Sequence, residues 1–415
     1  MLNDVQPIPR EKRHLLGFDL FLLWAGAAVA ISEVWAGGIL APLGFVGGML
    51  AILLGHVVGN TPFALGGILG SELGVPAMVS VRLAFGRWGS YLASFLNILQ
   101  LIGWTAIMVI ICARAGDEIL RALFGFSSPR LLLFVAGLVS TFWAFLETPW
   151  WKWMERVAVI ALAGLSGVMT FVALQQVSFG ELLRLRGEGS LPWGAGFDLV
   201  VAMPISWLPL VADYTRFARN TRGAFWGTWW GYFVASSWMY TVGLVSALTT
   251  GRTDPLPAMV VLGLGSIALA IVLFSTFTTT FLDIYSAAVS LLNVLPRFRQ
   301  KIAVALFGAL GTLLALVFPM ERYESFLFLI GAVFVPLFGV VLVDYFMVRR
   351  RKAQPEELYD KCPPIVREAL VSWILGVGVY TLFLRVFPGF GASVPSFLAA
   401  GGLYWVWRRR KGAWS

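Results

Sequence analysis

The sequence has little charge and few cysteines. Charged residues make up 13% of its 415 positions, whereas hydrophobic residues make up 59%, and the mean hydropathy is +0.81. Soluble domains average about 25% charged residues, so the composition excludes a soluble protein and predicts a polytopic membrane protein. The two cysteines, Cys112 and Cys362, give neither a disulfide framework nor the spacing of a metal site.

Motifs that carry enzyme chemistry are also missing. The two histidines are His14, in the N-terminal tail, and His56, which stands alone in an apolar run. The sequence contains no Gly-rich phosphate loop and no zinc-protease motif, so we expect no enzyme and no cofactor. The formal net charge of +9 is divided among short clusters between apolar runs, which indicates membrane topology rather than nucleic-acid binding.

What the sequence has in abundance is long apolar segments. Each is about long enough to cross roughly 30 Å of hydrocarbon at 1.5 Å per residue. The predicted spans are 17–39, 42–67, 88–113, 131–148, 156–178, 196–212, 225–249, 260–291, 302–319, 325–347, 369–387 and 392–407. Most of the 31 Lys and Arg residues lie in the two tails and in the loops on the same side. Positive-inside bias therefore places both termini in the cytoplasm of a cell-membrane protein, and we expect no removable signal peptide.

The spans predict an all-α membrane protein of about 12 transmembrane helices. Five spans per half invert the second half in the membrane, an arrangement in which the first and sixth helices are discontinuous and meet a solute near the midplane. The predicted parts are a tail (1–16), a first repeat (17–180), a second repeat (196–347), a cytoplasmic loop (348–368), spans eleven and twelve (369–407) and a tail (408–415).

Both helices of the predicted pair carry features that interrupt a helix. In the sixth span, Pro204 and Pro209 interrupt the run ISWLPLVADYTRF, and a proline frees backbone polar groups that are tolerable at membrane depth only around a cavity or ligand. In the first span, glycines surround Glu33, a carboxylate that at mid-span needs a cavity or a partner. Asp213 and Arg216 close the sixth span, where we expect them to pair across a gate or to anchor the helix end.

The third span carries polar residues on one face. Asn97, Gln100 and Trp104 are spaced i, i+3, i+7. An indole that stacks beside an amide that donates and accepts suits a flat heteroaromatic ring. The alternative is ordinary interhelical hydrogen bonding around a packed tryptophan.

The eighth span carries Ser275, Thr278 and Thr279 at i, i+3, i+4, followed one turn later by Asp283. Their oxygens suit a hard cation such as sodium. The alternative is that the hydroxyls bond back to carbonyls one turn earlier in the same helix.

Three stretches resemble the first nucleobase:cation symporter family. They are WLPLVADYTRFAR, STFTTTFLDIYSAAVSLLNVLP and LVDYFMVRR, and WAGAAVAISEVWAGGILAPLG is similar to the hydroxymethylpyrimidine or thiamine-precursor permease branch. The resemblance implies a five-plus-five inverted repeat with two extra helices. It also implies a substrate held between spans one, three, six and eight, often with sodium between spans one and eight.

Carried over position by position, the resemblance implies that Trp104 stacks on the ring. It places a second contact near Ser206 and Trp207. Some family members have a glutamine at the position that Met108 occupies in this sequence, so the resemblance gives the role of that glutamine to Gln100. The implied sodium ligands are Val29, Ser32, Ser275, Thr278 and Thr279. Glu33 and Asp283 are carboxylates at positions where the family has neutral amides.

These departures suggest the substrate. A carboxylate accepts well from the exocyclic amine of a 4-aminopyrimidine. We therefore expect Glu33, Asp283 or both to bind the amino group of hydroxymethylpyrimidine or of a related thiamine precursor. The rival mechanism gives one of them a coupled proton, as in a proton-coupled cytosine, purine or allantoin permease. A channel or a membrane sensor of the solute is also compatible with such a site. We expect the transporter to be a monomer.

Overall fold

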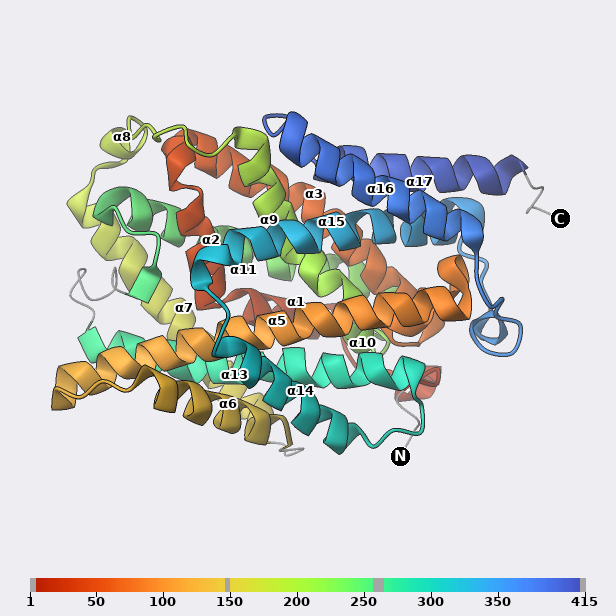
Figure 1. The fold of residues 1–415 in the computed structure, drawn as a ribbon, viewed down its shortest axis with the longest axis horizontal. Coiled ribbons are helices and arrows are strands. Elements are labelled where there is room, and N and C mark those ends of the chain that lie inside the picture. The colour runs from red at the N-terminus through yellow and green to blue at the C-terminus, as the bar shows by residue number, and fades with distance from the viewer. Residues whose placement is uncertain (1–4, 146–149, 257–264, 411–415) are drawn as a thin grey trace.

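The computed structural model describes residues 5–145, 150–256 and 265–410. Within them the regular structure is helical, apart from one isolated bridge between Leu15 and Ala218. Most long helices run side by side, and both ends of the chain lie at the same end of the bundle (Figure 1). We call this the terminal end, and the opposite one the far end.

The first half contains η1 (Arg10–Lys12), α1 (Gly17–Ala28), α2 (Ile31–Ile39), η2 (Ala41–Leu43), α3 (Gly44–Leu73), α4 (Ala77–Ser80), α5 (Arg82–Phe124), α6 (Pro129–Phe145), α7 (Trp150–Gln176) and α8 (Phe179–Leu182). After it come α9 (Trp193–Trp207), η3 (Leu208–Leu210), α10 (Val211–Thr215), α11 (Thr221–Thr250), α13 (Gly265–Val294), α14 (Gln300–Ala315), η4 (Met320–Arg322), α15 (Tyr323–Leu342), the π-helical η5 (Val343–Val348), η6 (Pro355–Leu358), α16 (Arg367–Val386) and α17 (Ser393–Arg410). Helices occupy most of the described part of every predicted span; residues 146–148 and 260–264 lie outside the described part.

The first span is broken, as the sequence predicts. Helix α1 ends at Ala28, and α2 begins at Ile31 after Ala30 adopts an extended conformation (φ −135°, ψ 147°). The sixth span is interrupted more mildly, because α9 passes into the 3₁₀ turn η3 around Pro209 and then into α10. Pro204, which we predicted to contribute to the break, lies inside α9 instead. Its ring fits there because α3 presents Gly59, whose missing side chain leaves room for it.

Corresponding helices of the two halves exchange partners. Helix α1 of the first half packs against α11 of the second half. The corresponding helix of the second half, α9, packs against α3 of the first half, and α3 corresponds to α11. In the same way α5 packs against α14, its counterpart α13 packs against α6, and α5 and α13 pack against each other. Two five-helix repeats related by inverted topology produce this pattern. The bounds 17–180 and 196–347 for the repeats remain predictions.

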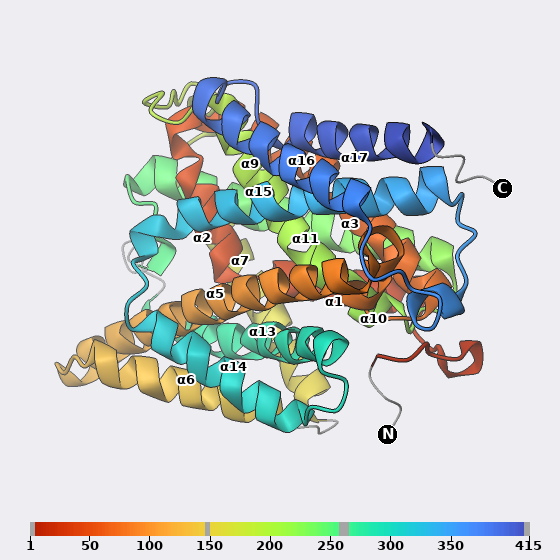
Figure 2. The same cartoon turned by 45° about the vertical axis from the view of Figure 1, so that its right-hand side comes forward.

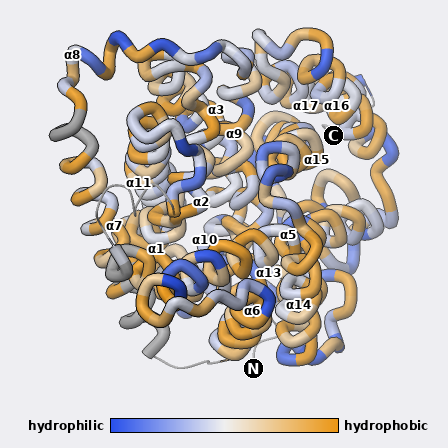
Figure 3. Tube along the Cα trace, turned by 60° about the vertical axis from the view of Figure 1, so that its left-hand side comes forward, coloured by the Kyte–Doolittle hydropathy of each residue, from blue (hydrophilic) through white to orange (hydrophobic). Residues whose placement is uncertain are grey.

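The outside of the bundle is apolar. By length and composition, six stretches of the described residues are able to cross a membrane, and four shorter apolar helices accompany them. Helix α14 exposes a stripe of large apolar side chains, namely Ile302, Leu306, Leu310 and Leu313. Figure 3 shows hydrophobic residues along most of the helices and hydrophilic ones mainly in connecting segments and at helix ends. Such surfaces suit lipid rather than water.

The last two helices stand outside the repeats. Helices α16 and α17 pack against each other and against α15, along one edge of the bundle (Figure 2). The core around the broken helices is therefore built by the preceding ten spans. At the terminal end, Leu15 pairs through its backbone with Phe217 and Arg219, which ties the start of α1 to the end of α10.

Candidate functional site

The polar face predicted on the third span meets two other helices. Gln100 of α5 donates from Nε2 to Asn97 Oδ1 at 2.8 Å and to the Ser206 carbonyl of α9 at 2.9 Å. Asn97 in turn donates from Nδ2 to Ser290 Oγ of α13 at 2.8 Å. The donors of Gln100 are thus used within the protein, while its Oε1 is buried and has no hydrogen-bond partner among the described residues.

Asp283 lies level with Trp104 across the contact between α13 and α5. These helices are antiparallel, since Asn97 bonds Ser290 and, further along, Cys112 Sγ lies 3.9 Å from the Leu273 carbonyl. Both helices rise by about 1.5 Å per residue, so Asp283, between Leu273 and Ser290, is level with the middle of 97–112. Its side chain is buried, and Oδ2 has no hydrogen-bond partner among the described residues.

Trp104 is buried in an aromatic cluster. Its ring meets those of Tyr323 and Phe326 edge to face, with centroids 5.9 and 5.4 Å apart. Tyr323 donates its hydroxyl to the Ser32 carbonyl of α2 at 3.1 Å. The predicted stacking tryptophan therefore contacts a residue that touches the start of α2. Tyr323 had no signal in the sequence beyond its place at a span end.

Ser206 and Trp207 lie where α9 ends. The Ser206 hydroxyl donates to the Met203 carbonyl at 2.6 Å, so it is the Ser206 carbonyl that faces Gln100. Trp207 is buried, and its ring meets that of Trp24 at 6.0 Å, which joins α9 to α1. The structure thus brings Ser206 together with the polar face of α5 and places Trp207 against the first helix.

Glu33 has partners on α11. Tyr232 donates to Glu33 Oε1 at 2.5 Å, and Ser236 Oγ lies 2.8 Å from Oε2. Ser236 Oγ also lies 2.5 Å from Nε2 of His56 on α3. His56 stands alone in its own span, and its partner comes from a helix 180 positions away in sequence. A histidine within a membrane span was itself a signal of a functional site.

The structure describes part of the predicted ion site. Val29 lies in the break between α1 and α2, and Thr279 is buried on α13. The side chains of Ser275 and Thr278 lie outside the described part of the protein. Bonding back to a carbonyl one turn earlier occurs at the neighbouring hydroxyls of Thr276 and Thr280, at 2.7 and 2.6 Å.

Asp213 and Arg216 anchor the end of the sixth span. Asp213 Oδ1 accepts from the Ala77 backbone N–H, which begins α4, at 2.9 Å. Arg216 donates from Nε to the Asp213 carbonyl at 3.1 Å, and its guanidinium lies over the ring of Phe217. Both residues hold the terminal end of α10 in place, away from Trp104 and Asp283.

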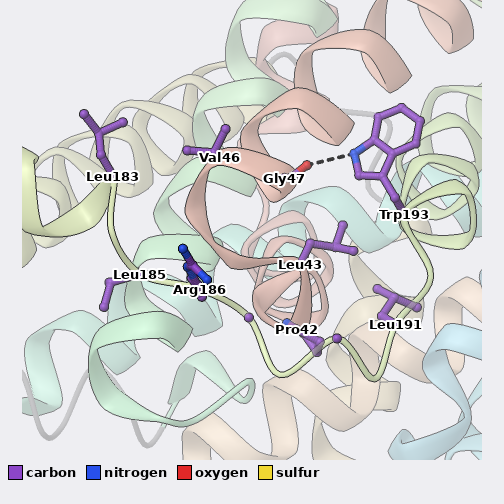
Figure 4. Close-up of a pocket in the computed structure, with 11 residues that line it drawn as sticks. Pro42, Leu43, Val46, Gly47, Leu183, Leu185, Arg186, Leu191 and Trp193 are labelled. Atoms are coloured by element: carbon purple, nitrogen blue, oxygen red, sulfur yellow. Dashed lines mark hydrogen bonds between the residues drawn. The ribbon is translucent and has the colours of Figure 1, made fainter.

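A surface hollow of about 450 Å³ lies elsewhere. It is formed where η2 and the start of α3 face the segment 183–193, and Figure 4 shows its mostly apolar lining, with the Trp193 indole donating to the Gly47 carbonyl. None of the residues predicted to bind solute or ion lines it. The buried polar cluster between α2, α5, α9 and α13 is therefore the better candidate for the solute site.

A family model described as a permease for cytosine/purines, uracil, thiamine and allantoin matches residues 7–406. The chain belongs to this family. It is 27% identical to the hydantoin permease of Microbacterium maritypicum over 339 residues, which are 75% of this chain and 68% of that protein. It is also 27% identical to the cytosine permease of Escherichia coli (strain K12) over 289 residues, 68% of this chain and 66% of that protein.

The fold is that of a solved transporter. The chain superposes on Mhp1, a nucleobase-cation-symport-1 family transporter in a closed conformation with bromovinylhydantoin bound, with a TM-score of 0.87 and 23% identity over 100% of this chain and 97% of that one. The protein is thus an all-α membrane permease of this family and not an enzyme. The predicted family and fold are confirmed.

Proposed function

We propose that this permease imports a small amino-bearing heteroaromatic ring by cation-coupled alternating access, with hydroxymethylpyrimidine or a related thiamine precursor as first candidate. In this proposal the protein is a monomer of the cell membrane with both termini in the cytoplasm. The ring lies against Trp104, between α5, α9 and α13. Solute and cation together bind the occluded state more tightly than the open states. This difference in affinity shifts the population toward the occluded state.

The observation that carries the proposal is a pair of buried, unpartnered acceptors. Gln100 Oε1 and Asp283 Oδ2 both lack a hydrogen-bond partner among the described residues. Leaving such groups unsatisfied costs about 1–3 kcal/mol each, and a ring that presents an amine and a second donor, such as the hydroxyl of hydroxymethylpyrimidine, relieves that cost. Both oxygens of Glu33, in contrast, already have partners. We therefore assign the amine to Asp283 rather than to Glu33.

Sodium is the proposed coupling ion. Its ligands would be backbone carbonyls at Val29 and Ser32 with the oxygens of Ser275, Thr278 and Thr279. The break after Ala28 supports Val29, because the last carbonyls of α1 lack the donors that a continuous helix would supply. The alternative is a proton-coupled permease for cytosine, purines or allantoin, the substrates named for the family.

Binding to purified protein tests the substrate. Hydroxymethylpyrimidine, thiamine, cytosine and hydantoin are titrated while tryptophan fluorescence is recorded, with and without sodium at fixed ionic strength. We expect an aminopyrimidine to quench most strongly and sodium to strengthen that binding. Quenching by hydantoin alone would contradict the assignment of Asp283, and binding that ignored sodium would contradict the ion site.

Asp283→Asn sharpens the test. We expect it to weaken aminopyrimidine binding at least tenfold, about 1.4 kcal/mol. Asp117→Asn is the matched control, because Asp117 is also buried on the bundle but its oxygens already accept from Ser127 and the Ser128 N–H. Equal effects of the two substitutions would contradict the proposal.

Transport separates the carrier from a channel or a sensor. Proteoliposomes with an inward sodium gradient should accumulate radiolabelled hydroxymethylpyrimidine above its outside concentration. A channel would only equalise the two concentrations, and a sensor would bind without moving the solute.

A further inference from the structure

Another surface hollow lies between the start of α1 and the start of α11. Its volume is about 440 Å³, and none of the residues predicted to bind solute or ion lines it. Residues of α1 form one side, and the first turns of α11 form the other. The hollow lies at the terminal end of the bundle, where Leu15 pairs through its backbone with Phe217 and Arg219.

The floor of the hollow is backbone, because glycines lie where the two helices meet. A Cβ atom on Gly227 would overlap the Gly17 carbonyl, and one on Gly223 would lie 3.1 Å from the Gly17 Cα atom. One turn further along α11, a Cβ atom on Gly231 would overlap the Phe21 carbonyl. Small residues let membrane helices approach this closely. The larger side chains on either flank therefore enclose a groove.

Aromatic side chains form the walls of this groove. Phe18 and Phe21 of α1 stack with their ring centroids 6.1 Å apart, and Trp226 and Trp230 line the groove from α11. Phe18 is 68% exposed, Trp226 47% and Trp230 46%. Phenylalanine favours the hydrocarbon of a membrane, and tryptophan favours the level of the lipid headgroups. The groove therefore suits an alkyl chain that enters it from the headgroup level.

One end of the groove is polar and positively charged. Arg222, in the first turn of α11, lines the hollow together with Asn220, and Arg219 is exposed three residues earlier. Neither arginine belongs to an ion pair among the described residues. The carboxylate on this part of α1, Asp19, accepts from the Leu16 backbone N–H at 2.8 Å. A guanidinium without a carboxylate partner suits phosphate, which it binds through two parallel hydrogen bonds.

The apolar groove and its charged end match the two parts of an anionic phospholipid. Basic pockets between membrane helices bind anionic headgroups. A free phosphate would meet Arg222 but would leave the aromatic walls uncovered. A second protein segment would cover the walls but would not by itself supply an anion for the arginine. A phospholipid supplies both.

We propose that the hollow between α1 and α11 binds one anionic phospholipid from the leaflet at the terminal end. One acyl chain lies along the glycine floor between the aromatic walls, and the phosphate lies at Arg222. The site is separate from the proposed solute and ion sites. Its test therefore needs no transported solute and does not depend on the proposed function.

Competition between two lipids tests the site. Purified protein in detergent is mixed with equal amounts of phosphatidylglycerol and phosphatidylcholine that carry the same acyl chains, and native mass spectrometry counts the lipids that stay bound. We expect one phosphatidylglycerol to bind about fivefold or more tightly than phosphatidylcholine, since each arginine near the surface favours the anionic lipid. Equal retention of the two lipids would overturn the proposal, because lipid that surrounds the bundle without selectivity binds in that way.

A pair of arginine variants locates the phosphate. Arg222→Gln should weaken phosphatidylglycerol binding about fivefold and bring it close to that of phosphatidylcholine. Arg299→Gln is the matched control, because Arg299 is also exposed and also precedes or begins a helix, here α14, but does not line the hollow. Equal effects of the two substitutions would overturn the assignment of the phosphate to Arg222.

A pair of phenylalanine variants locates the acyl chain. Phe18→Ser removes part of one wall and should weaken phosphatidylglycerol binding. Phe95→Ser should not, because Phe95 is 56% exposed on α5 but lies outside the hollow. Both side chains are exposed, so neither substitution removes a buried residue from the core. Equal effects of the two substitutions would overturn the placement of the chain.

Other occupants of the hollow give different results. Inorganic phosphate in excess, at fixed ionic strength, should leave the bound lipid in place. Displacement by phosphate would show that the arginine binds free anions, and would overturn the lipid assignment. A dimer mass that disappears with Phe18→Ser would assign the hollow to a second copy of the chain, and would overturn it as well.

Discussion

Gln100 donates to the Ser206 carbonyl at 2.9 Å, which joins the middle of α5 to the end of α9. That carbonyl is available because α9 ends at Trp207 and the chain continues as a 3₁₀ turn. The same amide bonds Asn97, and Asn97 bonds Ser290 of α13. One glutamine thus ties together three of the helices that surround the proposed solute site.

The first prediction concerns this amide. Gln100→Leu removes both bonds and leaves Asn97 Oδ1 and the Ser206 carbonyl without their donor, at about 1–3 kcal/mol for each unsatisfied group. We expect a lower melting temperature in detergent together with weaker quenching by hydroxymethylpyrimidine. The control is Gln300→Leu at the start of α14, which should change neither. Similar losses in both variants would contradict the central role of Gln100.

Much of this arrangement follows from local patterns in the sequence. Apolar runs predict the helices because each must fill the same hydrocarbon thickness. The i, i+3 spacing correctly predicts that Asn97 and Gln100 are neighbours, because helical geometry fixes which side chains meet. The break in the first span is likewise local, since glycines and a carboxylate at membrane depth mark it.

Contacts between distant helices were beyond such patterns. His56 looked isolated because Ser236 and Glu33 come from other helices, and sequence spacing does not say which faces meet. Pro204 looked like a helix breaker because its effect depends on the room that Gly59 of α3 provides. In both cases tertiary packing, not local preference, decided the outcome.

The second prediction concerns the far end. Arg114 of α5 pairs with Asp254 at 3.2 Å, and its guanidinium lies 5.7 Å from the centre of the Trp35 ring on α2. Exposed pairs contribute about 0–1 kcal/mol to stability, so Arg114→Gln should leave the melting temperature nearly unchanged. Since the pair joins α2 and α5 to the loop after α11, we expect the uptake rate to change instead. A large loss of stability with normal uptake would contradict this reading.

Acid should mimic that substitution. Burial raises the pKa of Asp254 above its ordinary value, although Arg114 opposes the shift. As the pH falls, this carboxylate therefore takes up a proton before an ordinary aspartate does, and the ion pair weakens. The difference in uptake rate between wild type and Arg114→Gln should shrink as the pH is lowered. A difference that grew on acidification would contradict the assignment.

The third prediction concerns a buried ion pair at the terminal end. Arg349 donates to Asp344 Oδ2 at 2.6 Å, while the Tyr404 hydroxyl donates to Asp344 Oδ1 at 2.6 Å. Removing one partner of a buried pair costs about 3–5 kcal/mol, because the other charge is left uncompensated. We expect Arg349→Met to lower the melting temperature strongly. Arg351→Met is the control, because its pair with Glu72 is more exposed, and it should have a much smaller effect.

The last prediction concerns the close contact between α2 and α11. A Cβ atom on Gly243 would overlap the Val34 carbonyl, and one on Gly37 would overlap the Tyr240 carbonyl. Small residues let membrane helices approach this closely, and the approach places Tyr232 and Ser236 against Glu33. Gly243→Ala should therefore separate the helices and lower the melting temperature in detergent. Gly402→Ala, which meets nothing within 4 Å, should leave the melting temperature unchanged, and a similar effect of both substitutions would show that this close packing does not hold α2 against α11.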